Sequence, residues 1–212
     1  MKNMSKTAII YAILAAALYA VNIPLSKLLL NHIPPTLMAG FLYLGAGIGM
    51  FLLSMIHKEK DEKQKLTKVE LPYTLGMIVL DIAAPIFLMF GLTMTNSANA
   101  SLLNNFEIVA TSIIALVCFK EIISPKLWTA ILFITVSTII LSFEDMSAFA
   151  FSKGSLLILC ACVCWGFENN CTRKLSSKSS TEIVVLKGLF SGIGSLIIGV
   201  IIRESLPNIK FI

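Results

Sequence analysis

Four ionisable residues lie deep within long apolar stretches of the sequence, and their chemistry gives the first indication of a function. They are Asp81, Glu107, Glu168 and Lys187. A charged side chain at the centre of a membrane helix costs about 2.5–3.5 kcal/mol on insertion scales, so each of these residues requires a reason. A carboxylate in such surroundings can exchange a proton or bind a cation, or it can stay neutral and hydrogen-bond to a neighbouring helix.

Asp81 and Glu107 have the strongest claim to a functional role. They fall at similar depth on neighbouring apolar segments that only a few residues connect, so we expect them to lie close together and to share a proton. Such a pair suits a proton-coupled carrier or a site for a cationic substrate, and a purely structural hydrogen bond remains the alternative. Lys187 falls about one turn into its segment, where we expect its ammonium group to reach the membrane interface.

Neutral polar residues accompany these acids on the same helix faces. Helical spacing places Asn104, Glu107 and Thr111 on one stripe, which lipid would not tolerate. Pro24 and Pro85 lie near polar residues inside other apolar segments, and a proline within a helix frees a carbonyl and bends the helix. We expect these segments to line a cavity. The candidate residues for substrate binding or proton coupling are Glu107, Asp81, Asn104, Asn22, Glu168 and Thr111.

The elements that must hold these residues are membrane-spanning helices. The 212-residue chain is 57% hydrophobic and 14% charged, which is typical of a membrane protein. A spanning helix needs about 20 mostly apolar residues, and seven segments approach or exceed that length. The sequence therefore predicts an all-α, polytopic transmembrane bundle. The predicted spans are Thr7–Leu30, Pro35–Ile56, Pro72–Leu92, Ser97–Phe119, Leu127–Phe143, Gly154–Thr172 and Glu182–Ile202.

The positive charges predict the orientation of the bundle. The formal net charge is +5, and most Lys and Arg residues fall on one side of the membrane if the N-terminus is cytoplasmic. That side receives Lys2, Lys6 and the Lys-rich stretch His57–Glu70. We therefore expect a multi-pass protein of the cell membrane with a cytoplasmic N-terminus. The basic charge then needs no nucleic acid as a partner.

The cysteines and histidines give little sign of a metal site or a disulfide framework. All five cysteines fall within predicted spans. Cys160, Cys164 and Cys171 share a helix face that could bind a soft ion such as Cu(I), but packing as small apolar residues is the preferred interpretation. The sequence contains no P-loop, GxSxG or HExxH motif. We expect no metal, no cofactor and no enzymatic activity.

An internal repeat relates the two ends of the chain. With an offset of 146 residues, Ala15–Lys27 aligns with Ala161–Lys174, and Leu42–Ser54 aligns with Gly188–Val200. Five spans separate the two starts, so the second copy enters the membrane from the opposite side. The predicted division is a first five-helix repeat at residues 1–148 and a partial second repeat at 149–212. Glycines that predict close helix packing are Gly45, Gly47, Gly49, Gly188, Gly192 and Gly194.

The stretch Gly91–Leu141 resembles the EamA family of the drug/metabolite transporter superfamily. It has a small-residue turn at Asn96–Ala98, and Glu107 and Glu121 match two glutamate positions of the family. Ile108 stands where the family has a proline, so the usual cause of a break in the fourth span is missing. The resemblance implies two five-helix EamA repeats around a central cavity.

The resemblance also implies a function, namely transport of small metabolites such as amino acids or drugs, often outward, by alternating access. Proton coupling stays open. The partners would be the lipid bilayer and a small-molecule substrate. The alternative is a partial or non-transporting subunit that needs a dimer partner or further C-terminal helices to complete the bundle. A seven-helix photoreceptor is disfavoured, because Lys2 and Lys6 place the N-terminus inside and Lys187 is shallow.

Overall fold

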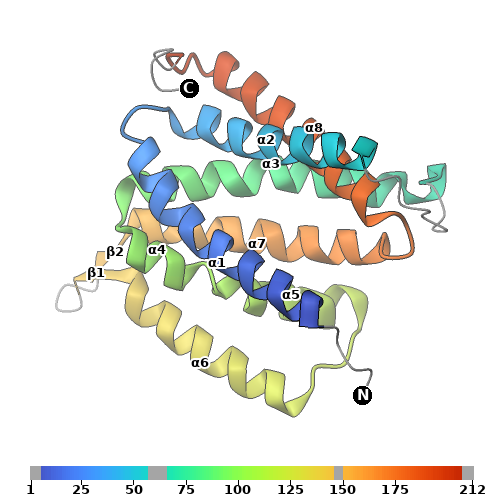
Figure 1. Cartoon of the computed structure of the whole chain (residues 1–212). Coiled ribbons are helices and arrows are strands. Elements are labelled where there is room, and N and C mark those ends of the chain that lie inside the picture. Colours follow the sequence, from blue (N-terminus) through green and yellow to red (C-terminus); the bar gives the residue numbers. More distant parts are fainter. Residues whose placement is uncertain (1–5, 57–65, 146–149, 207–212) are drawn as a thin grey trace.

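The chain forms a bundle of long antiparallel helices (Figure 1). The computed structural model describes residues 6–56, 66–145 and 150–206. Most of the predicted Lys-rich stretch at 57–70 lies outside these residues. The helices are α1 (Lys6–Leu29), α2 (Pro35–Ile56), η1 (Lys68–Glu70), α3 (Leu71–Met94), α4 (Ser97–Leu103), α5 (Phe106–Phe119), α6 (Pro125–Ser142), α7 (Lys153–Lys174) and α8 (Ser180–Ile201).

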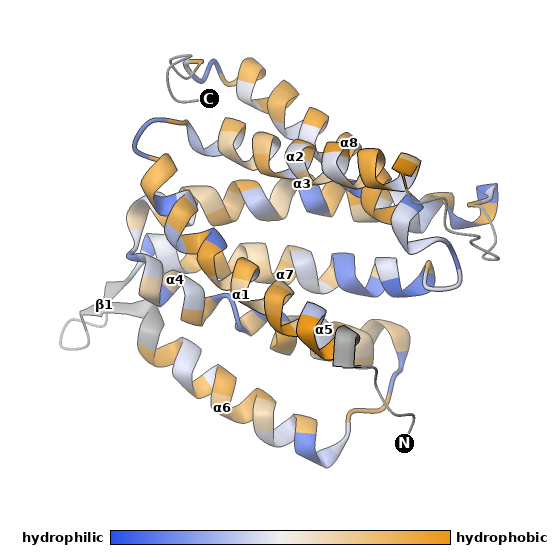
Figure 2. Cartoon of the chain, viewed as in Figure 1, coloured by the Kyte–Doolittle hydropathy of each residue, from blue (hydrophilic) through white to orange (hydrophobic). Residues whose placement is uncertain are grey.

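The predicted all-α, polytopic membrane bundle is confirmed. Six stretches of the described chain are long and apolar enough to cross a membrane, with α4 and α5 together forming one of them. The remaining predicted span corresponds to α6, whose described apolar part, Pro125–Ile140, is shorter. Figure 2 shows apolar residues covering α1, α6 and α8, and hydrophilic residues gathered near the helix ends and along one end of α7. A short hairpin of β1 (Phe143–Asp145) and β2 (Ala150–Phe151) connects α6 to α7.

Helices α2 and α8 pack against each other in antiparallel fashion through glycine. A methyl group placed on Gly188 would lie 2.4 Å from the Cα of Gly47, and one placed on Gly192 would lie 2.7 Å from the backbone nitrogen of Leu44. The backbones therefore approach each other as they do in small-residue membrane interfaces. The predicted packing role is confirmed for Gly47, Gly188, Gly192 and Gly194, whereas Gly45 and Gly49 have nothing within 4 Å of an added methyl group.

Helices α3 and α7 form the second close antiparallel pair and occupy the middle of the bundle (Figure 1). A methyl group on Gly91 of α3 would lie 2.8 Å from the carbonyl oxygen of Gly154 in α7. Gly166, further along α7, allows α5 to approach, since a methyl group there would lie 2.9 Å from the Cβ of Ala110. The helix α7 thus contacts both α3 and α5, and it places its polar residues between them.

The predicted span Ser97–Phe119 is interrupted between α4 and α5, although no proline is present. Around Asn104 and Asn105 the backbone forms tighter turns, with the amide of Asn105 bonded to the carbonyl of Leu102 and that of Glu107 to Asn104. The side-chain amide of Asn105 donates to the carbonyls of Ser101 and Leu102. The thiol of buried Cys162 donates weakly to carbonyls at the break, 3.6 Å from that of Asn104. Side chains therefore donate hydrogen bonds to backbone carbonyls at the break.

Different polar contacts stabilise the two ends of the bundle. At one end Glu204 accepts from the backbone amides of Thr36 and Leu37, and Lys27 donates to the carbonyl of Leu92. At the opposite end, Arg173 pairs with Glu121, and Lys178 lies 3.1 Å from Glu70. These contacts tie together helices that are distant in the sequence.

Candidate substrate cavity and buried ion network

A cavity of about 380 Å³ lies between α1, α2, α3, α5, α7 and α8. Nine of its fifteen lining side chains are aliphatic or aromatic, and the other six are polar or charged, a mixture that suits a small-molecule site. Its lining residues are Tyr19, Asn22, Ile23, Leu42, Tyr43, Ala46, Pro85, Leu88, Met89, Asn104, Glu107, Trp165, Glu168, Asn169 and Lys187.

On one side of the cavity, Lys187 joins two buried carboxylates. Its ammonium nitrogen lies 3.1 Å from Oδ2 of Asp81 and 2.9 Å from Oε1 of Glu168. The two acids are 0% and 1% exposed, so the lysine supplies the countercharge that burial would otherwise deny them. This ion cluster, Asp81–Lys187–Glu168, ties α3, α7 and α8 together.

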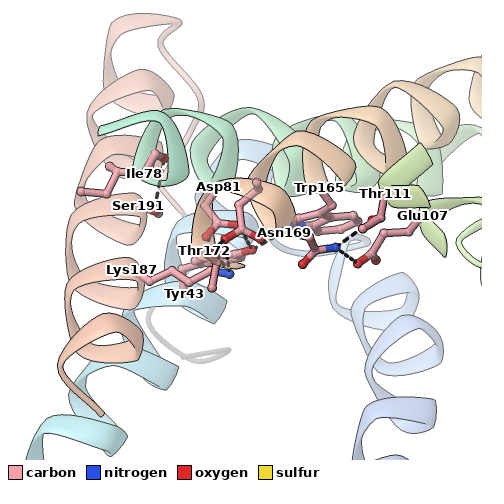
Figure 3. A network of polar contacts seen from close by, with 11 residues as sticks. Tyr43, Ile78, Asp81, Glu107, Thr111, Trp165, Asn169, Thr172, Lys187 and Ser191 are labelled. Atoms are coloured by element: carbon pink, nitrogen blue, oxygen red, sulfur yellow. Dashed lines mark hydrogen bonds and ion pairs between the residues drawn. The ribbon is translucent and has the colours of Figure 1, made fainter. Parts of the chain in front are cut away.

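Hydrogen bonds extend the ion cluster in both directions (Figure 3). Tyr43 donates its hydroxyl proton to Oδ1 of Asp81 over 3.0 Å and accepts from the indole N–H of Trp165 over 3.3 Å. Thr172, one turn beyond Glu168 on α7, donates to that carboxylate. The result is a continuous polar chain from Trp165 to Thr172 through the centre of the bundle.

On the other side of the cavity, Glu107 contacts a neutral group. The side-chain amide of Asn169 donates to Glu107 over 2.7 Å and approaches the hydroxyl of Thr111 at 3.1 Å. No ion pair involves Glu107 within residues 6–56, 66–145 and 150–206. Next to it, the amide of Asn104 donates to the hydroxyl of Tyr19 over 3.2 Å. Glu107 is therefore held in place without a countercharge.

The structure brings all six sequence-predicted site residues to this region. Asn22, Asn104, Glu107 and Glu168 line the cavity. Two others lie behind the wall: Asp81 contacts Lys187, and Thr111 contacts Asn169, which is itself a lining residue.

Two interpretations of the sequence are wrong. Lys187 does not extend to the interface, because it forms ion pairs with Asp81 and Glu168. Asp81 does not share a site with Glu107; Figure 3 shows them in separate groups, and the second acid at the lysine is Glu168. The prediction that Asp81 lies beside Glu107 assumed that two spans adjacent in the sequence also pack side by side, with their central residues at the same depth. The structure instead pairs α3 with α7.

Tyr43, Trp165 and Asn169 were missed as site residues. Two of them had a signal in the sequence, since Tyr43 places a hydroxyl inside an apolar span and Asn169 follows Glu168 directly. Buried tyrosine and tryptophan normally find partners for their polar atoms. For the Cu(I) alternative, which concerned Cys160, Cys164 and Cys171, the described part of the chain contains no three His, Cys, Asp or Glu side chains placed to hold a metal ion.

Comparison with known proteins connects this architecture to a family. The model of the EamA-like transporter family matches residues 6–143, which is more than half of the chain. The chain belongs to the EamA-like transporter family. The ion cluster lies partly beyond the matched segment, since Glu168 and Lys187 fall after residue 143.

A relative of this EamA-like chain is an uncharacterized transporter of Methanothermobacter thermautotrophicus, which is 23% identical. The alignment covers 89% of this chain and 59% of the relative, so the chain spans less than two thirds of that protein. No solved structure matches the chain. Family and relative identify a multi-pass membrane protein of a transporter family.

Proposed function

We propose that this chain transports a small metabolite, such as an amino acid or a drug, outward across the cell membrane by alternating access. The observation that carries the proposal is the cavity of about 380 Å³, which combines apolar walls with Glu107, Glu168 and Lys187. A membrane protein maintains ionisable groups at such depth at a cost, and they commonly mark a substrate or ion pathway.

Two inverted units, at residues 1–148 and 149–212, would provide the moving parts. The aligned segments Leu42–Ser54 and Gly188–Val200 fall on α2 and α8, which pack side by side in opposite directions. Inverted copies related by an axis in the membrane plane would be arranged in this way. Rocking of one unit against the other would expose the cavity alternately to the two sides.

A cytoplasmic N-terminus fits the distribution of positive charge. The bundle end that carries Arg173 and Lys178 would then face the cytoplasm, as basic residues generally do. Their ion pairs with Glu121 and Glu70 would hold that side closed, and the cavity would open outward once substrate has been loaded from inside.

Proton coupling would use Glu107. This carboxylate lies at the cavity wall without a countercharge, so proton uptake there would change the charge of the substrate site directly. The acids of the ion cluster are less suited, because Lys187 already neutralises part of their charge.

Vesicle transport tests this function. The chain is reconstituted into lipid vesicles, and a panel of labelled amino acids and amphiphilic drugs is followed with and without a proton gradient. We expect gradient-driven transport that Glu107→Gln abolishes or uncouples, while Ser112→Ala, on the same helix α5 but outside the cavity lining, retains it. Absence of transport for every compound, or transport by Glu107→Gln with unchanged pH dependence, would contradict the proposal.

A second candidate is a membrane subunit that works only with a partner, either a second copy or further helices. Tyr19 favours it, because this residue lines the cavity and yet is 62% exposed, so α1 leaves that side of the cavity uncovered. Cross-linking through a cysteine introduced at Tyr19 in native membranes tests this candidate. A specific cross-linked product supports a partner, and a monomer that transports by itself excludes the need for one.

A further inference from the structure

The two acids that line the cavity have opposite partners, and this difference points to the charge of the substrate. Glu168 is paired with Lys187, which Asp81 also contacts. Glu107 accepts from the neutral amide of Asn169 and forms no ion pair with any residue that the structure describes. A ligand therefore meets one carboxylate whose charge is already compensated and one whose charge is not.

The balance of charge favours a cation. Asp81, Glu107 and Glu168 carry three negative charges when ionised, and Lys187 is the one cation among the described residues that line the cavity. Bringing an anion into this site would add a like charge where the dielectric is low. The carboxylate of an amino acid would also find no available partner, since the ammonium of Lys187 already contacts two acids.

The walls of the cavity favour an apolar body behind the positive charge. Tyr19, Tyr43 and Trp165 supply aromatic rings, whose faces attract cations and whose area packs against apolar groups. Leu88 and Met89 add an aliphatic surface from α3. The bundle already holds one alkylammonium group in this cavity, namely its own Lys187, between two carboxylates.

We propose that the cavity binds an amphiphilic organic monocation, with its ammonium group on the carboxylate of Glu107 and its apolar body among the aromatic side chains. This inference rests on the proposed transport function and narrows it to one substrate class. A proton and the ammonium compete for the same carboxylate, so entry of the cation displaces a proton from Glu107 to water. Exchange of one cation for one proton follows.

Three probes of similar shape and different charge test the proposal: 2-phenylethylamine, 2-phenylethanol and 3-phenylpropionate. Binding to the purified chain in lipid nanodiscs is measured by titration calorimetry. We expect the amine to bind at least about tenfold more tightly than the alcohol, a difference of about 1.4 kcal/mol, and the acid not to bind. The affinity for the amine should fall as the pH is lowered.

Two variants separate the charge of Glu107 from its structural role. Glu107→Gln keeps a group that can accept from Asn169, so it should fold normally and lose the preference for the amine. Ser112→Ala, on the same helix α5 but outside the cavity lining, removes a hydroxyl that donates to the carbonyl of Ile108, and should bind the amine as the unmodified chain does. Circular dichroism and the unfolding midpoint confirm that both variants are folded.

The outcomes distinguish the substrate class from the function. Equal binding of amine and alcohol, tighter binding of the acid, no binding of any probe, or unchanged amine binding by folded Glu107→Gln would overturn the cation proposal. Vesicle transport of a neutral or anionic compound alone would also overturn it and leave the transport function standing. Amine binding without vesicle transport of any compound would overturn the transport function while the cation site stands.

Discussion

The two sides of the cavity differ in how they hold their acids, although they lie on the same helix α7. On one side Lys187 shares its charge between Asp81 and Glu168 and connects α3, α7 and α8. On the other side, Glu107 of α5 accepts from the neutral amide of Asn169. The first arrangement compensates its charges internally, whereas the second gives Glu107 no cationic partner among the residues that the structure describes.

We infer from this difference that the ion cluster maintains the fold and that Glu107 is the acid available to a substrate or a proton. Burying a charge is costly, and removing one partner of a buried pair is worse, because the other charge is then left uncompensated. The ion cluster should therefore be sensitive to any loss of charge balance. Neutralisation of Glu107 should leave the fold stable. The loss of its negative charge should weaken substrate binding and reduce transport.

Lys187→Met should have the largest effect on stability. The substitution leaves Asp81 and Glu168 buried without a cation, and we expect a loss of about 3–5 kcal/mol in the free energy of unfolding. Titration with a denaturing detergent measures this loss. Adding Asp81→Asn and Glu168→Gln to the same chain should recover much of the stability; no recovery would show that the lysine acts through packing.

Gly188→Ala should destabilise the side of the cavity that holds the ion cluster, because it displaces α8. The added methyl group would lie 2.4 Å from the Cα of Gly47, so α2 and α8 must separate and carry Lys187 with them. We expect a loss of about 1–3 kcal/mol, which is typical of overpacking. Gly45→Ala is the matched control, because nothing lies within 4 Å of its added methyl group. Similar unfolding curves for the two variants would contradict the close approach.

Tyr43→Phe should cost less, about 0.5–1.5 kcal/mol in the free energy of unfolding, because Asp81 keeps its contact with Lys187. It removes the donor to Asp81 and the acceptor of the Trp165 indole while keeping the ring. A thermal unfolding midpoint compared with that of Tyr11→Phe, an exposed tyrosine on α1, measures the effect. Equal midpoints would mean that the polar chain ends at Asp81.

Glu107→Gln should have the smallest effect on stability, within about 1 kcal/mol. The amide oxygen of glutamine can replace the carboxylate as the acceptor from Asn169. The same detergent titration checks this expectation. A loss as large as that of Lys187→Met would erase the contrast between the two sides and make Glu107 a structural acid.

The positions of the helices could be predicted from the sequence, because hydropathy alone determines them. Long apolar segments must form helices in lipid, because each backbone group needs an internal partner. The predicted spans accordingly match the helices within a few residues at their ends. The break between α4 and α5 could not be predicted, because the sequence has no proline there. The backbone carbonyls at the break accept hydrogen bonds from Asn105 and from a cysteine on a distant helix.

The acids of the site could be picked out from the sequence, but Tyr43, Trp165 and Asn169 were missed, and the pairings could not be predicted. Polar residues inside apolar spans indicated Asp81, Glu107 and Glu168 directly. Which acid meets which base depends on how the helices pair, and the contact of Asp81 with Lys187 joins α3 to α8, which are far apart in the sequence, so no local pattern encodes it. Lys187 shows the result: it lies about two turns into α8, too deep to reach the interface easily, and α3 and α7 approach it with an acid each.

The contact of Cys162 with the α4–α5 break also makes this thiol a natural chemical reporter. The side chain is 0% exposed, and its Sγ lies against the carbonyls of Leu103 and Asn104. Alkylation by a membrane-permeant maleimide can therefore proceed only when α4, α5 and α7 separate locally. Exposed Cys118, further along α5, provides an internal reference for the reagent. The ratio of the two labelling rates would measure how often the wall that carries Glu107 opens, without any engineered probe.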